Sequence, residues 1–270
     1  MLDALSPARR RFFLVLAALA VLALLAGAAV ALVRSRDEPV HAVPQSDPGP
    51  VLLVPGYGGS TEGLEVLAAR LRAAGRDVTV VPAFDGGTGD LRAQARALAD
   101  AAEAVLTRSG AGSVDVVGYS AGGVVVRLWV AEEGGGEVVR RAVTLASPHH
   151  GTDIAALGGD LAPDACPAAC RQLSPDSDLM RRLATEDETP PGPLWVSIWT
   201  TDDQVVVPPE SGRLDGSVAF AVQSVCPETL GHADVPRDPT VAAMVVLELG
   251  TDPPAVPGAG VCRGRATDQG

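Results

Sequence analysis

The chain has 270 residues, of which 47% are hydrophobic and 3% are aromatic, so Val, Leu and Ala must supply most of any core. This length suits one large α/β domain and is short for two. The formal net charge is −12, and every basic residue is Arg. A surface this negative repels phosphates and argues against nucleic-acid binding, while the recurrent apolar runs exclude a fully disordered chain.

The amino-terminal region contains an unbroken apolar stretch, residues 12–33, directly after the cluster Arg9-Arg10-Arg11. A membrane span needs about 20 such residues. We therefore predict a transmembrane signal anchor at residues 12–33 and a cytoplasmic amino terminus at residues 1–11, because basic residues favour that side. A cleaved signal peptide is the alternative, since small residues around Gly27 offer cleavage sites. Both hypotheses place the rest of the chain outside the cytoplasm, either held at the cell membrane or secreted.

The polar residues 34–50 predict a linker, and residues 51–270 predict one domain. Six short runs rich in β-branched residues predict buried strands at residues 51–54, 78–81, 114–117, 143–146, 194–199 and 218–222. Helical patterns predict helices at residues 62–74, 91–108, 121–132 and 240–249. This alternation predicts a mostly parallel sheet with helices on both faces.

Residues 152–193 lack a clear strand and predict an insertion or cap. The four cysteines form an even set, which suits disulfides in an exported domain. Proximity favours a Cys166–Cys170 bridge, and the need to tether the tail favours a Cys226–Cys262 bridge. A zinc site is the alternative, but the spacing of Cys166 and Cys170 does not match a zinc knuckle. We predict no metal and no other cofactor.

The strongest motif is Gly118-Tyr119-Ser120-Ala121-Gly122, which follows a predicted buried strand and precedes a predicted helix. Such a sharp turn holds the serine exposed at the tip of the strand. In this context the motif resembles the nucleophile elbow of the α/β-hydrolase superfamily, and more narrowly that of bacterial class 2 lipases and related esterases. The resemblance implies the α/β-hydrolase fold, with Ser120 as the nucleophile.

Four further segments match the pattern of that family in its order. The segment from Val51 to Ser60 resembles the first-strand loop of the family, with Pro55 where a His is usual. The resemblance implies an oxyanion hole made by the backbone N–H groups of Tyr57 and Ala121. The segment from Leu145 to Thr152 resembles a stretch that shapes the floor of the site. There His149 is expected to be structural, and His150 to be exposed.

The resemblance also supplies the other two catalytic side chains. The segment Trp199–Pro208 matches the pattern around the family's catalytic carboxylate and assigns that role to Asp203, with Asp202 as the alternative. His232, in a loop after the last predicted strand, is then the base. A serine hydroxyl needs such a neutral imidazole to accept its proton, and the carboxylate holds the imidazole in the required tautomer.

The predicted function is hydrolysis of carboxylic esters, of neutral acyl or lipid type, outside the cytoplasm. No Lys or Arg cluster lies near the predicted site loops, so a highly anionic substrate is not indicated. Acyl transfer by the same three residues is an alternative, since an alcohol can replace water. A non-catalytic, membrane-tethered binding protein of this fold is a second alternative. A peptidase or amidase has no specific support, and the sequence leaves the oligomeric state open.

Overall fold

The computed structural model describes residues 16, 18–27, 40, 42–185 and 187–265, in two compact units, residues 1–40 and 41–270. In the first unit, residues 18–27 are helical. The predicted cytoplasmic segment, half of the predicted membrane span and residues 34–39 and 41 of the predicted linker lie outside the described residues. In the part of the chain that is described, no helix combines the length and apolar character needed to span a membrane.

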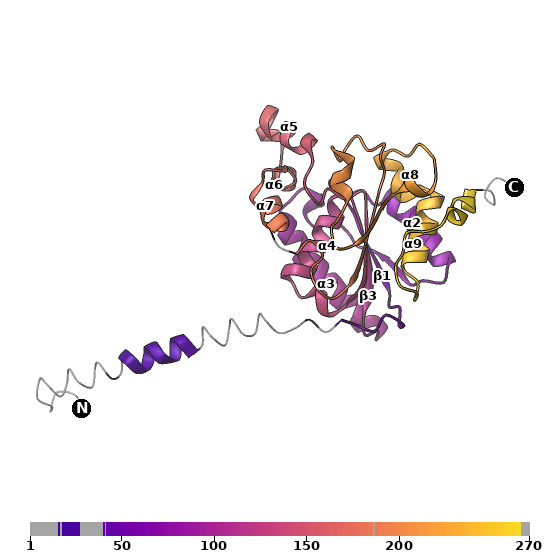
Figure 1. Ribbon diagram of the computed structural model, residues 1–270. Coiled ribbons are helices and arrows are strands. Elements are labelled where there is room, and N and C mark those ends of the chain that lie inside the picture. The colour runs from indigo at the N-terminus through magenta and orange to yellow at the C-terminus, as the bar shows by residue number, and fades with distance from the viewer. Residues whose placement is uncertain (1–15, 17, 28–39, 41, 186, 266–270) are drawn as a thin grey trace, which may run out of the picture. The chain divides into compact units, whose positions relative to one another are not determined.

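The second unit is built on a six-stranded sheet in the order β2-β1-β3-β4-β5-β6 (Figure 1). Every neighbouring pair is parallel, which confirms the predicted sheet type. The strands are β1 (Val51–Val54), β2 (Val78–Val80), β3 (Val114–Tyr119), β4 (Val139–Leu145), β5 (Leu194–Trp199) and β6 (Val218–Ala221). In this sheet β2 and β3 lie on opposite sides of β1. The loops that follow β1 and β3 therefore diverge at the carboxyl ends of these two strands, and sheets of this type bind ligands at such a point.

Helices cover both faces of this sheet, with α3 and α4 on one side and α2 and α9 on the other (Figure 1). In β1, Leu52 and Val54 pack with the first pair of helices, while Val51 and Leu53 pack with the second pair. Burial on both faces explains why the strands are continuous apolar runs. The helices are α2 (Glu62–Ala73), α3 (Leu91–Ser109), α4 (Ala121–Glu132), α8 (Val222–Val225) and α9 (Pro239–Glu248).

The predicted insertion is helical, and its described residues contain no strand. Its helices are α5 (Asp153–Leu161), α6 (Ala168–Gln172) and α7 (Asp178–Thr185). Ala155, Leu173 and Leu183 bury their side chains in the same core as α3 and α4. Short 3₁₀ turns complete the domain: η2 (Phe84–Gly87), η3 (Gly135–Glu137), η4 (Pro163–Ala165), η5 (Pro209–Gly212), η6 (His232–Arg237) and η7 (Ala259–Arg265).

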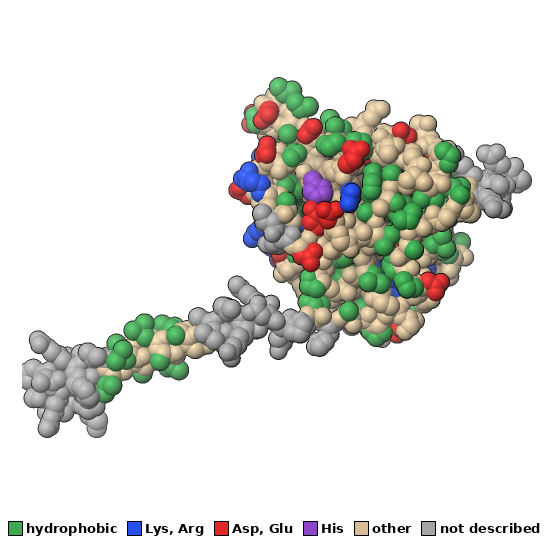
Figure 2. Space-filling view, viewed as in Figure 1, with side chains coloured by type: hydrophobic (Ala, Val, Ile, Leu, Met, Phe, Trp, Pro, Cys, Tyr) green, Lys and Arg blue, Asp and Glu red, His purple; other side chains and the backbone are tan. Residues whose placement is uncertain are grey.

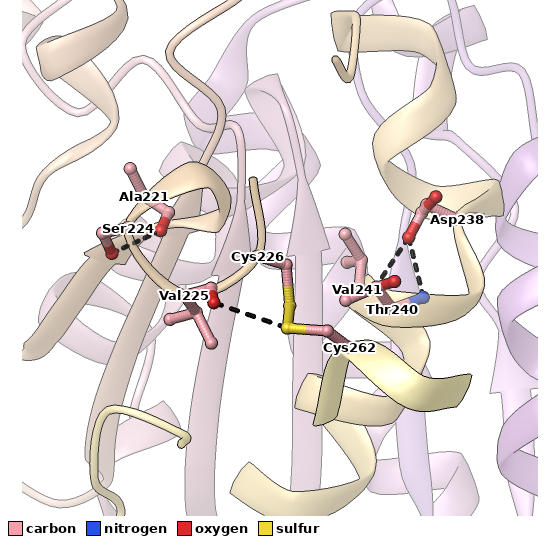
Figure 3. Close-up of a disulfide and its surroundings, with 8 residues drawn as sticks. All are labelled: Ala221, Ser224, Val225, Cys226, Asp238, Thr240, Val241 and Cys262. Atoms are coloured by element: carbon pink, nitrogen blue, oxygen red, sulfur yellow. Dashed lines mark hydrogen bonds between the residues drawn. A yellow bond between two sulfur atoms is a disulfide. The ribbon is translucent and has the colours of Figure 1, made fainter. Parts of the chain in front are cut away.

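Two disulfides link the cysteines in the predicted pairs, Cys166 with Cys170 and Cys226 with Cys262. The first lies in the insertion, and the second ties η7 to the end of α8 beside α9 (Figure 3). In the same view, Asp238 accepts hydrogen bonds from two backbone N–H groups and caps the start of α9. These bridges leave no cysteine thiolate for the alternative zinc site.

Strand β4 begins at Val139, four residues before the predicted start, and its early part contains buried Arg140 and Arg141. The prediction was wrong here because buried charge is unexpected in a strand unless it is paired. Arg140 Nη2 lies 2.6 Å from Asp115 Oδ2 in β3, and Arg76 Nη2 lies 2.5 Å from the same oxygen. Two guanidinium groups therefore share one buried carboxylate at the amino-terminal end of the sheet.

The last residues of the predicted linker bind to this cluster. Gln45 Nε2 donates to Arg140 O at 3.2 Å, and Arg140 Nη1 donates back to Gln45 O at 3.0 Å. Arg76 Nη2 also donates to Gly49 O at 2.8 Å. The chain thus enters the domain at the amino-terminal end of the strands, opposite the end at which ligands are expected.

Candidate active site

Ser120 occupies a strained turn between β3 and α4, with φ 53° and ψ −128°. The flanking glycines permit this turn. A Cβ at Gly122 would lie 2.4 Å from Val54 O, and a Cβ at Gly118 would lie 2.6 Å from Gly123 Cα. Real Cβ atoms do not approach other atoms so closely. Close packing around the turn therefore explains why the motif has glycine at both of these positions. Strain of this kind concentrates at functional sites.

The structure brings Ser120, His232 and Asp203 into one continuous chain of contacts. His232 Nε2 lies 3.0 Å from Ser120 Oγ, and His232 Nδ1 lies 2.7 Å from Asp203 Oδ2. The three side chains come from the end of β3, from η6 and from the loop after β5. This arrangement can accept the hydroxyl proton on one side of the imidazole while the carboxylate holds the other.

The two adjacent aspartates have different surroundings. Asp203 is buried, and its Oδ1 accepts hydrogen bonds of 2.8 Å from both Val205 N and Val206 N. Asp202 Oδ2 instead accepts from Leu230 N at 3.0 Å. Asp203 therefore contacts the imidazole directly, while Asp202 anchors the start of the loop that carries His232.

Tyr119, the residue before the nucleophile, contacts the same imidazole, a contact that its sequence position does not reveal. Its hydroxyl donates to His232 O at 3.1 Å, and the two ring centroids are 5.3 Å apart. Burial raises the pKa of the Tyr119 hydroxyl, and the negative charge of Asp203 adds to that effect. The phenol therefore stays protonated and able to donate.

The two predicted oxyanion-hole residues follow β1 and Ser120. Ala121 is the first residue of α4, a position whose N–H has no acceptor within the helix. The loop after β1 lies against the nucleophile, because a Cβ added to Gly56 would lie 2.8 Å from Ser120 Cβ. The next residue, Tyr57, follows directly in this loop.

Two further histidines, His149 and His150, lie apart from this chain of contacts. His149 is 1% exposed and its Nε2 lies 2.9 Å from Thr144 Oγ1. Burial, together with the charge of Arg127, lowers the pKa of His149 well below its usual value. His150 Nε2 lies 2.7 Å from Glu188 Oε1 in a more exposed position.

Two hollows open on either side of Ser120, and both are also lined by Tyr57 and Val205. The first, which we call the η6 hollow, has a volume of about 750 Å³ and is also lined by His232 and Arg237. The second, the α5 hollow, measures about 550 Å³. Its further lining comes mostly from apolar side chains of the insertion and the loop after β5: Ile154, Ala155, Leu173 and Val206.

The exposed surface of α5 is apolar as well. Ile154, Leu157 and Leu161 are 48%, 52% and 81% exposed, and Figure 2 shows apolar side chains gathered over this corner of the domain. Arg237 beside the site was not identified from the sequence, because its position depends on how η6 folds back toward β3.

Comparison with known proteins identifies the architecture. A family model described as "alpha/beta hydrolase fold" matches residues 49–164. None of the curated proteins compared with the sequence matches it significantly.

Several solved structures share the fold of the chain. Lipase B from Aspergillus fumigatus is 21% identical, with a TM-score of 0.66 over 79% of this chain and 56% of that one. The Bacillus licheniformis lipase BlEst2 is 18% identical in its propeptide form, with a TM-score of 0.65 over 82% of this chain and 54% of that one. Its mature form gives a TM-score of 0.57 over 74% of this chain and 91% of that one, at 18% identity. The chain thus spans little more than half the length of the first two structures.

Proposed function

The chain has the α/β-hydrolase fold and resembles lipases and esterases, and from this premise we propose that it is a serine hydrolase that cleaves carboxylic esters of neutral acyl or lipid type. The observation that carries the proposal is the chain of contacts from Ser120 through His232 to Asp203, with distances of 3.0 and 2.7 Å. Both distances lie within hydrogen-bonding range, so the imidazole can accept the hydroxyl proton while the carboxylate orients the imidazole.

The proposed reaction passes through an acyl-enzyme. Ser120 Oγ attacks the ester carbonyl while its proton moves to His232 Nε2. The negative charge on the carbonyl oxygen is stabilised by the N–H groups of Tyr57 and Ala121. The imidazolium then protonates the departing alkoxide, which leaves as the alcohol. Water repeats the sequence and releases the acid, while Asp203 stays ionised throughout.

Hydrogen bonding supports the role assigned to Asp203. Its carboxylate accepts from two backbone N–H groups as well as from the imidazole, so both of its oxygens are held in place. In this position the carboxylate can stabilise the imidazolium that forms during attack. Acyl transfer to an alcohol uses the same steps, with the alcohol in place of water, and stays the alternative reaction.

We also propose that the domain works outside the cytoplasm. The two disulfides support this location, because such bonds persist in oxidising compartments. Attachment through a membrane span at residues 12–33, or secretion after cleavage, stays a prediction from the sequence. Mass spectrometry of the protein without reduction is expected to find no free thiol, and four alkylatable cysteines would contradict the oxidised location.

A fluorophosphonate probe tests the proposed nucleophile directly. We expect the full-length protein to be labelled at Ser120 and to hydrolyse p-nitrophenyl esters. Ser120→Ala should abolish both signals, while the matched control Ser109→Ala, at the far end of α3, should keep them. Absence of labelling in folded protein would contradict catalysis and favour the non-catalytic binding protein.

A further inference from the structure

The two hollows beside Ser120 differ in chemistry. The η6 hollow is lined by Arg237 and His232 in addition to apolar residues such as Leu64. The α5 hollow has no charged side chain in its lining, and its walls include Ile154 and Leu173. An ester bound at Ser120 has an acyl part and an alcohol part, which we call its acyl arm and its alcohol arm. Each arm must enter one of these two hollows.

The position of His232 decides which arm enters which hollow. In the proposed reaction the imidazolium protonates the departing alkoxide, so the alcohol oxygen must lie within hydrogen-bonding distance of His232 Nε2. His232 lines the η6 hollow and does not line the α5 hollow. The alcohol arm therefore lies in the η6 hollow, and the acyl arm extends into the α5 hollow.

The α5 hollow suits an extended apolar acyl chain. Burial of apolar surface stabilises binding in proportion to the area removed from water. Ile154, on the first turn of α5, stands in the wall of this hollow and is 48% exposed. A larger side chain at this position can narrow the hollow without disturbing the core.

The η6 hollow suits an alcohol that carries a further hydroxyl group. Arg237 Nη2 lies 3.3 Å from Glu62 Oε2, and both side chains are substantially exposed, at 49% and 82%. Such a pair is weak, and of its two members only Arg237 lines the hollow. Its guanidinium can donate a hydrogen bond to the oxygen of a hydroxyl group.

We propose that Ile154 and Arg237 set the specificity of the two arms: the enzyme prefers esters with a long apolar acyl chain and an alcohol that carries a further hydroxyl group. This inference rests on the proposed function. It adds the direction in which the ester binds and the two side chains that select its arms.

A pair of isomeric esters tests the direction of binding. Methyl octanoate and heptyl acetate have the same composition but place the long chain on opposite sides of the carbonyl. We expect kcat/KM for methyl octanoate to be higher by about tenfold or more in the full-length protein, because the α5 hollow has no charged side chain in its lining, whereas Arg237 lines the η6 hollow. Equal values, or a preference for heptyl acetate, would overturn the assignment.

Variants of two α5 residues test whether Ile154 selects the acyl arm of the ester. Ile154→Trp should lower the ratio of the two kcat/KM values about tenfold. The matched control Leu161→Trp changes a residue of the same helix that is 81% exposed and does not line the hollow, and it should leave the ratio unchanged. An unchanged ratio in Ile154→Trp, or an equal fall in the control, would contradict the role of Ile154.

A second ester pair tests the alcohol arm. 2-Hydroxyethyl octanoate and propyl octanoate have nearly the same shape, and the wild type should prefer the first by about fivefold. Arg237→Met should bring that ratio close to one, whereas the control Arg213→Met, beside a different hollow, should not. A preference that survives Arg237→Met would refute this part of the inference.

The proposed function can fail separately from this inference. If the fluorophosphonate does not label Ser120, the catalytic proposal fails and this inference fails with it. If Ser120 is labelled and esters are hydrolysed but the ratios differ from those expected, only the assignment of the arms is wrong.

Discussion

At the scale of single residues, Asp202 and Asp203 are neighbours in the sequence but have different roles. Asp203 contacts the imidazole, and Asp202 holds Leu230 N, two residues before His232. The spacing to Pro208 identified Asp203 in the sequence, but only the fold shows what its neighbour does.

The two aspartates should therefore respond differently to substitution. Asp203→Ala is expected to lower kcat for ester hydrolysis by about 10³–10⁴-fold, because the imidazole loses its orienting carboxylate. Asp202→Ala is expected to reduce stability by about 1–2 kcal/mol through the lost hydrogen bond, with a much smaller effect on kcat. Steady-state kinetics and chemical denaturation of both variants give the comparison. The reverse order of kcat values would assign the carboxylate role to Asp202.

The candidate site could be predicted from the sequence only where a motif has a fixed local spacing. Ser120, Asp203 and His232 each lie in such a segment. Tyr119 lies in the same motif, but its hydrogen bond to His232 O crosses from β3 to η6 and leaves no local pattern. Arg237 is isolated in the sequence and reaches the site only because η6 turns back over the β1 loop.

At the scale of elements, the turn between β3 and α4 forms only if Gly122 carries no side-chain atom. Gly122→Ala is expected to destabilise the protein by about 1–3 kcal/mol and to abolish probe labelling, because its Cβ would lie 2.4 Å from Val54 O. Gly112→Ala is the control, since a Cβ there would meet no atom within 4 Å. Thermal unfolding and labelling test both; a Gly122→Ala variant that keeps wild-type stability and labelling would contradict this packing argument.

Elements that are buried on both faces were the easiest to predict. The strands around β1 and β3 are continuous apolar runs because helices cover both sides. The start of β4 could not be predicted this way, since Arg140 and Arg141 break the apolar run and are accommodated by partners distant in sequence. The helices of the insertion are short, and their arrangement depends on packing against α3 and α4.

At the scale of the whole molecule, a buried carboxyl group at the end of α9 should make stability depend on pH. Glu248 is 3% exposed, and burial raises its pKa from 4.5 to about 7. The folded state therefore favours the protonated form. The contribution of Glu248 to the free energy of unfolding is fully present below pH 4.5 and is lost as the pH rises toward 7.

Glu248→Gln should remove this dependence. Between pH 4 and pH 8, the free energy of unfolding of the variant should rise relative to that of the wild type by about 3 kcal/mol. Denaturant titrations at both pH values measure the difference, and exposed Glu103→Gln on α3 serves as the control. A difference that does not change with pH would show that Glu248 titrates normally in the folded state.

The two disulfides should contribute unequally to stability. They close loops with sequence separations of 36 for Cys226–Cys262 and 4 for Cys166–Cys170. A longer loop restricts the unfolded chain more strongly, so the double substitution Cys226→Ala/Cys262→Ala should cost about 4 kcal/mol and Cys166→Ala/Cys170→Ala about 2 kcal/mol. Unfolding midpoints in denaturant rank the two, and an equal or reversed order would contradict the loop-length argument.

The sheet also has short outer strands. β2 has three residues and β6 has four, whereas the central β3 and β4 have six and seven. A strand at the margin of a sheet exposes unpaired amide and carbonyl groups that can recruit a foreign strand, and few such groups are present on margins this short. Self-association by strand addition is thereby disfavoured, which protects an apolar, valine-rich chain from forming fibrillar aggregates.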